Sequence, residues 1–275
     1  MVRRSVLFAP GDKPALMRKA AESDADVVVF DLEDAVAPAD KQCAREAVRE
    51  VLDDVESDSE VCVRVNPIGI SAAIDLEVVL EGPNPDSVML PKTEAAEDVR
   101  TVDRLLEERD AEFPVLSLIE SAAGVLRADD IATADATDAL LFGAEDLAAD
   151  IGAIRTSEGT EVLYARERTV IAASAAGVDA IDIVFTDYTD VDGLREETTF
   201  AAGLGYDGKM AIHPDQVPII NDAFTPDDED VEWAERVLDA QGQTDAGVFE
   251  VDGEMIDAPL IAQAERIVER ARQAE

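Results

Sequence analysis

The chain has 275 residues and carries 23 lysine and arginine residues against 63 aspartate and glutamate residues, a formal net charge of −40. This charge excludes a nucleic-acid-binding surface as the main function, because phosphate backbones require cationic neutralisation. Since 47% of the residues are hydrophobic, the chain can bury a substantial core and is not a disordered acidic tail.

The basic residues are mostly arginines, and the only lysines are Lys13, Lys19, Lys41, Lys92 and Lys209. A carboxylate-rich, lysine-poor surface resembles that of halophilic proteins from salt-loving archaea. At molar salt the Debye length falls to about 3 Å, so repulsion between surface carboxylates is screened. The composition therefore indicates a salt-rich habitat and not a function.

The N-terminus begins like a secretory leader, but its apolar run stops at Pro10 and Gly11 and is too short for a leader's hydrophobic region. Nothing later in the sequence approaches the length of a membrane span. We therefore expect a cytoplasmic protein with no membrane partner.

Short apolar runs alternate with longer segments of helical spacing, such as 14–23, 41–55, 95–109 and 164–176. Continuous apolar strands are typical of a parallel sheet that is buried on both faces. The repeated strand–helix pattern predicts a closed (β/α)₈ barrel, the TIM barrel, over residues 1–224. A doubly wound open sheet is the alternative. The predicted strands are 5–10, 27–33, 61–66, 88–91, 115–120, 139–143, 180–185 and 209–213.

The pattern changes in the C-terminal extension, residues 225–275. Helical spacing recurs at 227–240 and 259–274, and a short hairpin is predicted at 248–257 around Asp252 and Gly253. This segment is too short for a core of its own. We expect it to form a lid or a subunit contact.

Polar side chains are sparse within the predicted strands and recur at their carboxyl ends. Glu120 and Asp146 follow strands five and six, which are neighbours in the predicted barrel. Two carboxylates at one spot repel each other unless they share a proton or a cation. With one histidine and two cysteines in the chain, hard oxygen ligands point to Mg²⁺. The alternative is that both are solvated loop acids.

Arg64 lies near the end of a buried strand and needs an anionic partner there. Its planar guanidinium suits a carboxylate or an enolate oxygen of a substrate. The alternative is an internal ion pair with Asp31 or Glu33. His213, the only histidine, is expected to have a binding role at most.

Seven motifs in order resemble the citrate lyase β-subunit-like family within the HpcH/HpaI aldolase superfamily. Each block alone is weak, but the ordered set spans nearly the whole chain. The matching blocks are 4–11, 30–36, 63–67, 90–92, 119–122, 142–147 and 208–214.

The resemblance implies a TIM-barrel carbon–carbon lyase that acts on acyl-CoA thioesters with Mg²⁺, or Mn²⁺ as a substitute, and that is usually trimeric. The family's metal ligands match Glu120 and Asp146, and its substrate-binding arginine matches Arg64. Ala15 replaces a basic residue that several relatives carry near the CoA site. The positions implied for substrate or CoA binding are Phe8, Lys19, Glu145, Ile212 and His213. From their place at the end of strand two, we expect Asp31, Glu33 and Asp34 to orient metal-bound water and Arg64.

The segment 253–259 is similar to the lid of malyl-CoA and citramalyl-CoA lyases. There an aspartate at the position of Asp257 reaches into a neighbouring subunit's site as the catalytic acid or base. The alternative is a helix N-terminal acid ahead of Pro259.

The predicted reaction is the reversible cleavage of malyl-CoA or β-methylmalyl-CoA to glyoxylate and acetyl-CoA or propionyl-CoA. The alternatives are a citramalyl-CoA lyase, a malyl-CoA thioesterase, and a citrate lyase β subunit that acts within a larger complex. The expected partners are an acyl-CoA, glyoxylate or another 2-oxo acid, and further copies of the chain in a homotrimer or a dimer of trimers.

Overall fold

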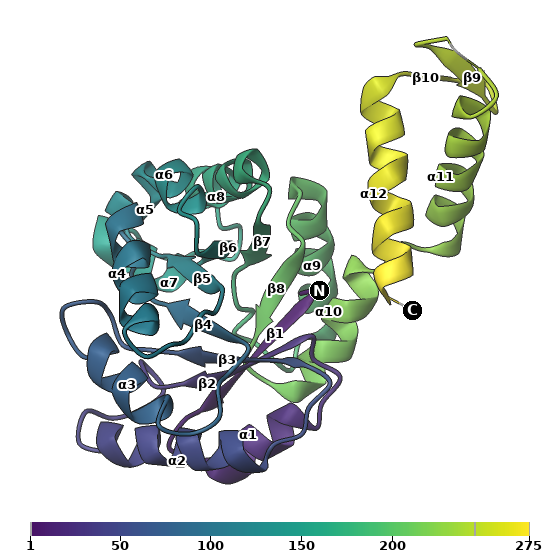
Figure 1. The fold of residues 1–275 in the computed structure, drawn as a ribbon. Coiled ribbons are helices and arrows are strands. Elements are labelled where there is room, and N and C mark those ends of the chain that lie inside the picture. Colours follow the sequence, from purple (N-terminus) through teal and green to yellow (C-terminus); the bar gives the residue numbers. More distant parts are fainter. Residues whose placement is uncertain (1, 245, 275) are drawn as a thin grey trace. The chain divides into compact units, whose positions relative to one another are not determined.

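A computed structural model describes residues 2–244 and 246–274. Eight parallel strands pair in chain order and close into a barrel, which Figure 1 shows enclosed by helices. Strands β1 and β8 close the ring, with Val6 paired to Met210, so the predicted TIM barrel is confirmed and the open sheet is wrong. The strands are β1 (Ser5–Pro10), β2 (Val27–Asp31), β3 (Glu60–Arg64), β4 (Ser87–Leu90), β5 (Val115–Ile119), β6 (Thr137–Phe142), β7 (Asp179–Asp182) and β8 (Gly208–Ala211).

Helices follow the strands around the outside of the barrel (Figure 1), and those predicted in this region are confirmed to within two residues at each end. They are α1 (Pro14–Ala21), α2 (Lys41–Asp54), α3 (Ala72–Val79), α4 (Ala96–Glu107), α5 (Ala122–Leu126), α6 (Ala128–Ala132), α7 (Ala144–Ile151), α8 (Leu163–Ala176) and α9 (Val191–Leu204). After β8 come a short 3₁₀ turn, η1 (Pro214–Gln216), and α10 (Val217–Phe224).

Strands β2 to β8 end one to three residues earlier than predicted, and a local cause is visible at β2 and β3. The predicted strands reached Glu33 and Asn66, but β2 ends at Asp31 and β3 ends at Arg64. The backbone N–H of Glu33 donates to Oδ1 of Asp31 at 2.8 Å, and that of Asn66 donates to Oδ2 of Asp75 at 2.6 Å. Because side-chain carboxylates take over these N–H groups, the residues leave the sheet.

Alternating apolar residues fill the barrel interior. Val27 and Val29 of β2 pack with Leu116 and Leu118 of β5 in one buried cluster. Successive side chains of a strand point to opposite faces, so the intervening residues face the helices. The interior is a packed core, and reactive groups of such a barrel therefore lie at its carboxyl-terminal face.

The opposite, amino-terminal face is held by Arg3. Its guanidinium lies 2.7 Å from Glu60, 2.6 Å from Asp138 and 3.0 Å from Asp179, at the start of β3, β6 and β7. One buried cation thus ties together the amino ends of several strands. Burial of this charge is tolerated because each face of the guanidinium fork has a carboxylate partner.

A second buried ion network attaches β7 and β8 to their helices. Asp182 binds Arg166 of α8 at 2.5 Å and Lys209 of β8 at 3.0 Å, and Lys209 also lies 3.0 Å from Glu197 of α9. Asp182 and Lys209 have no solvent exposure. Pairing of every charge explains why these ions are retained in the core.

The described residues divide into two compact units, one of residues 3–221 and one of residues 222–274 with Val2, and the division falls within α10. In the second unit, α11 (Asp228–Gln241) and α12 (Ala258–Ala274) pack with a hairpin of β9 (Phe249–Val251) and β10 (Glu254–Ile256). Asp252 and Gly253 form the hairpin turn with φ of 53° and 88°, the left-handed geometry that Asp-Gly turns favour. No described helix has both the length and the apolar composition needed to cross a bilayer.

Gly208 is required where the barrel closes. A Cβ at this position would lie 1.8 Å from the carbonyl oxygen of Arg3. We expect Gly208→Ala to lower the free energy of unfolding by about 3 kcal/mol, measured by denaturant unfolding in concentrated KCl.

Gly203→Ala is the matched control. Gly203 is an exposed residue inside α9, and a Cβ there meets no atom within 4 Å. Its replacement should stabilise the protein by about 0.5–1 kcal/mol through helix propensity. A Gly208→Ala protein as stable as wild type would show that the backbone of Arg3 does not pack this closely against Gly208.

Candidate active site

Side chains of alternating charge form a continuous row of ion pairs across the carboxyl-terminal face of the barrel. Arg64 joins Asp31 to Glu33, with separations of 2.7 Å and 3.2 Å. Lys92 then joins Glu33, at 2.6 Å, to Asp146, at 3.5 Å. The five side chains come from the ends of β2, β3 and β4 and from the first turn of α7. Distant segments therefore meet at one polar cluster.

Arg64 is fixed by contacts on several sides. Its Nε and Nη2 donate to the two oxygens of Asp31, both at 2.7 Å, and its guanidinium carbon lies 5.0 Å from the centre of the Phe8 ring. Burial alone would lower the pKa of Arg64, but the carboxylates of Asp31 and Glu33 raise it. The internal ion pair held open as an alternative is therefore present, and it leaves other N–H donors of the fork available.

Asp31 is the buried partner of this pair. Burial alone would raise its pKa, but hydrogen bonds from Arg64 and from the backbone N–H groups of Glu33 and Ala35 hold the pKa below its ordinary value. The carboxylate therefore stays ionised and orients Arg64.

The loop after β2 is held by Lys41. Its Nζ donates to the carbonyl oxygens of Leu32 and Glu33, at 2.7 Å and 2.6 Å, and to Oδ1 of Asn66 at 2.9 Å. The amide nitrogen of Asn66 donates in turn to buried Asp75 at 2.7 Å. These contacts fix the backbone from which Glu33 enters the cluster.

Glu120 follows β5 and is only 4% exposed, whereas the side chain of Asp146 is 43% exposed. Oε1 of Glu120 accepts a hydrogen bond of 2.7 Å from the backbone N–H of Lys92. A Cβ on Gly143 would lie 2.6 Å from Cβ and 2.7 Å from Oε2 of Glu120. The glycine that directly follows β6 is therefore required by the close approach of this glutamate.

The surroundings of Glu120 disfavour its charge. Burial is the main cause that raises the pKa of Glu120 from its ordinary 4.5 to about 8. The nearby Asp146 carboxylate contributes to this rise, and the hydrogen bond from the backbone of Lys92 opposes it. Such a group binds either a proton or a cation at neutral pH.

These two carboxylates fit a magnesium ion. Within residues 2–244 and 246–274, no group of three or more His, Cys, Asp or Glu side chains has the arrangement of a metal site. Mg²⁺ needs only one or two protein carboxylates, because it keeps several waters and takes further oxygen ligands from a substrate. Glu120 and Asp146 supply hard oxygen atoms of this kind.

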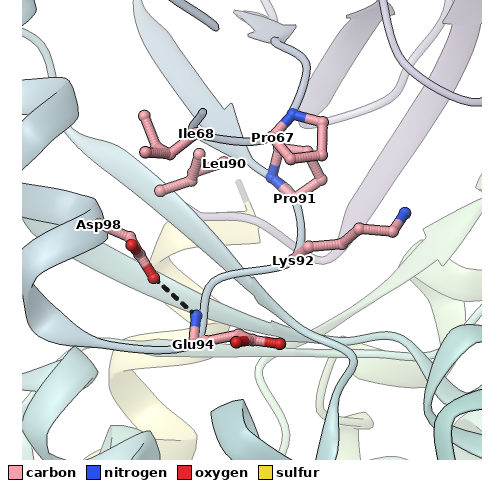
Figure 2. Close-up of a pocket in the computed structure, with 7 residues that line it drawn as sticks. All are labelled: Pro67, Ile68, Leu90, Pro91, Lys92, Glu94 and Asp98. Atoms are coloured by element: carbon pink, nitrogen blue, oxygen red, sulfur yellow. Dashed lines mark hydrogen bonds between the residues drawn. The ribbon is translucent and has the colours of Figure 1, made fainter. Parts of the chain in front are cut away.

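A pocket of about 240 Å³ lies beside the cluster, at the ends of β3 and β4. Figure 2 shows Lys92 extending its side chain away from Ile68 and Asp98 on the other side of this pocket. Asp98 accepts hydrogen bonds of 2.9 Å from the backbone N–H groups of Glu94 and Ala95. Its carboxylate thus caps α4.

A family model described as HpcH/HpaI aldolase/citrate lyase matches residues 4–214. The chain belongs to this family. A second model, described as carbon–carbon bond lyases of the TIM-barrel fold, matches residues 156–273. The predicted family and the predicted enzyme class, a carbon–carbon lyase, are confirmed.

Relatives match over almost the full chain. The citrate lyase subunit beta-like protein of Mycobacterium tuberculosis is 41% identical, over 98% of this chain and 95% of its own length. The mitochondrial citramalyl-CoA lyase of Mus musculus is 37% identical, over 97% and 85% respectively. The crystal structure of CitE from Mycobacterium tuberculosis, in complex with magnesium, acetoacetate and coenzyme A, has a TM-score of 0.85 at 39% identity and covers 98% of both chains.

The other predicted residues of the barrel differ in their exposure and in the contacts that they make. Asp34 is exposed and adds its negative charge near Lys92. Glu145 pairs with Arg155 at 2.9 Å. His213 accepts a hydrogen bond from the backbone N–H of Asp215 and stacks on Tyr188 with ring centres 4.9 Å apart. Ile212 is exposed beside it, and Lys19 is exposed in the last turn of α1.

Asp257 belongs to the second compact unit. It is exposed, directly precedes α12, and its carbonyl oxygen accepts a hydrogen bond of 3.0 Å from the N–H of Ile261. Asp257 therefore lies at the start of a helix, as the alternative interpretation expects. The catalytic role of Asp257 stays a prediction.

Sequence reasoning assigned no role to Lys92 or Lys41. Both are among five lysines in a chain with 63 acids, and Lys92 falls at the end of a predicted strand. This rarity and position are the signal that could have identified Lys92.

The raised pKa of Glu120 predicts a pH-dependent stability in the absence of divalent metal. Because the folded pKa of about 8 exceeds the ordinary 4.5, the stabilisation from the bound proton is complete below about pH 4.5. It is lost as the pH rises through 8. Glu120→Gln cannot titrate, so its stability relative to wild type should increase by on the order of 3 kcal/mol between pH 5 and pH 9.

Urea unfolding in EDTA and concentrated KCl at pH 5, 7 and 9 measures this difference. Comparison of the two proteins at each pH cancels the titration of the remaining carboxyl groups. A difference that stays constant with pH would contradict the raised pKa.

Proposed function

We propose that the chain is a Mg²⁺-dependent lyase that reversibly cleaves malyl-CoA or β-methylmalyl-CoA to glyoxylate and acetyl-CoA or propionyl-CoA. The observation that carries this proposal is the placement of Glu120, at the end of β5, near Asp146 of α7 and beside the Arg64 cluster. The complex of CitE from Mycobacterium tuberculosis with magnesium, acetoacetate and coenzyme A supports it.

Glu120 and Asp146 would hold the metal ion. When bound, Mg²⁺ supplies Lewis acidity that lowers the pKa of the substrate hydroxyl group. Lys92 holds Glu120 through its backbone N–H, which fixes one ligand oxygen before substrate binds. Glu33 holds the Lys92 side chain on the other side of the cluster.

Arg64 would stabilise the negative charge that develops on the thioester oxygen as the carbon–carbon bond breaks. Asp31 and the Phe8 ring hold the guanidinium in place, so its remaining N–H donors are oriented before the reaction. Preorganised donors at the point of developing charge are an effective means of catalysis.

In the cleaving direction the substrate hydroxyl would lose its proton to a water molecule as the carbonyl of glyoxylate forms, and Asp257 would protonate the enolate carbon of the departing acyl-CoA, so that no net proton is gained or lost. In the condensing direction Asp257 would remove the proton from that carbon and water would return one to the new hydroxyl. We assign Asp257 to the site of a neighbouring subunit in a homotrimer or a dimer of trimers. Phe8, Lys19, Ile212 and His213 would contact the CoA portion, and Glu145 would contact the substrate.

Citramalyl-CoA, which gives pyruvate in place of glyoxylate, is the second candidate substrate. The 37% identity to the mitochondrial citramalyl-CoA lyase of Mus musculus favours it.

A panel of purified 3-hydroxyacyl-CoA esters, assayed in concentrated KCl with Mg²⁺, tests the function. We expect malyl-CoA or β-methylmalyl-CoA to give glyoxylate and a shorter acyl-CoA, with activity lost in EDTA and restored by Mg²⁺ or Mn²⁺. Free malate with CoA would identify a thioesterase. Failure to turn over any free CoA ester would favour a carrier-dependent citrate lyase subunit.

Subunit mixing tests the role of Asp257 in a neighbouring site. Asp257→Ala and Glu120→Gln should each be nearly inactive alone, since each lacks one part of every site. Random co-assembly in a cyclic oligomer restores complete sites in about a quarter of positions, so the mixture should recover about a quarter of wild-type activity. Near-normal activity of Asp257→Ala alone, or no recovery on mixing, would contradict the assignment.

A further inference from the structure

Lys92 contacts both proposed metal ligands through different parts of the same residue. Its backbone N–H donates to Oε1 of Glu120 at 2.7 Å. Its Nζ lies 3.5 Å from Oδ1 of Asp146 and 2.6 Å from Oε1 of Glu33. The side chain is 37% exposed, so this ammonium lies at the edge of the cluster and not in the core.

The backbone of Lys92 has an unusual conformation at this position. Its φ of 50° is in the left-handed region, which disfavours residues that carry a Cβ. Figure 2 shows the side chain pointing away from Asp98, which is engaged in capping α4. The ammonium therefore has its carboxylate partners on the side of Glu33 and Asp146.

The charges of the cluster are unequal. Five carboxyl groups lie with or near two cations, Arg64 and Lys92; they are those of Asp31, Glu33, Asp34, Glu120 and Asp146. Arg64 contacts Asp31 and Glu33, so Lys92 is the basic side chain that reaches Asp146. A divalent ion on Asp146 would share that carboxylate with an ammonium of the same sign, and like charges at such distances repel.

We propose that Lys92 is an internal cation that opposes Mg²⁺ and sets the affinity of the site for the metal. Its backbone N–H positions Glu120, while its side-chain charge competes with the metal for Asp146. This proposal rests on the metal site of the proposed function. Lys92 is then a positioning residue with two opposite effects: its backbone N–H supports the site, and the charge of its side chain weakens metal binding.

Titration of Mg²⁺ into the metal-free protein by calorimetry tests the proposal without reference to catalysis. At pH 9, above the pKa of Glu120, competition from protons is small. We expect Lys92→Met to bind Mg²⁺ about tenfold more tightly than wild type, because it keeps the backbone N–H and removes the competing charge. Lys92→Arg, which keeps the charge, should bind within about twofold of wild type.

Arg104→Gln is the control for net charge. Arg104 pairs with Glu97 at 3.0 Å on the exposed side of α4, and its loss should leave the Mg²⁺ affinity unchanged. If circular dichroism shows that Lys92→Met is unfolded, Lys92→Gln replaces it as a second neutral side chain, with the same expectation.

The outcomes separate this inference from the function on which it rests. A wild type that binds no Mg²⁺ would overturn the metal site and this inference together. A wild type that binds Mg²⁺, with folded neutral variants that bind no more tightly, would overturn the role of Lys92 alone.

Discussion

Burial of the Glu120 carboxylate near Asp146 is the constraint on which the rest of the site depends. Burial raises the pKa of Glu120 to about 8, so the folded chain must supply either a proton or a cation at this point. Gly143 leaves the space for the glutamate, and the left-handed backbone of Lys92 aims an N–H at it. The protein has a net charge of −40, and in this site its basic side chains Arg64 and Lys92 pair with the buried carboxylates of Asp31 and Glu33.

The two interpretations of Arg64 are compatible. Asp31 takes two of its N–H groups, and a guanidinium has five, so the ion pair orients the fork without exhausting it. Asp31 and Lys41 both hold the loop after β2, and Glu33 of that loop holds the side chain of Lys92, so the two halves of the cluster are connected. Structure and proposed chemistry depend on the same side chains.

The barrel and the candidate site are predictable from the sequence to different extents. Apolar runs predicted every barrel strand, and polar residues at strand ends identified Glu120, Asp146 and Arg64. The predicted strands were too long where side-chain carboxylates such as those of Asp31 and Asp75 accept hydrogen bonds from backbone N–H groups that would otherwise pair in the sheet. A hydropathy pattern contains no information on such side-chain hydrogen bonds. Lys92 reaches Glu33 across 59 positions of sequence, a contact that only the closed barrel creates. Asp75 is one of 63 acids and carries no signal of its own.

The most direct test of the central claim is the number of protons released when Mg²⁺ binds the wild-type protein at pH 7. Calorimetric titrations in two buffers of different ionisation enthalpy give this number. With the pKa of Glu120 at about 8, metal binding should displace about one proton at pH 7 and almost none at pH 9.5. Mg²⁺ binding without proton release at pH 7, or equally tight binding by Glu120→Gln, would contradict the placement of the metal on this buried carboxylate.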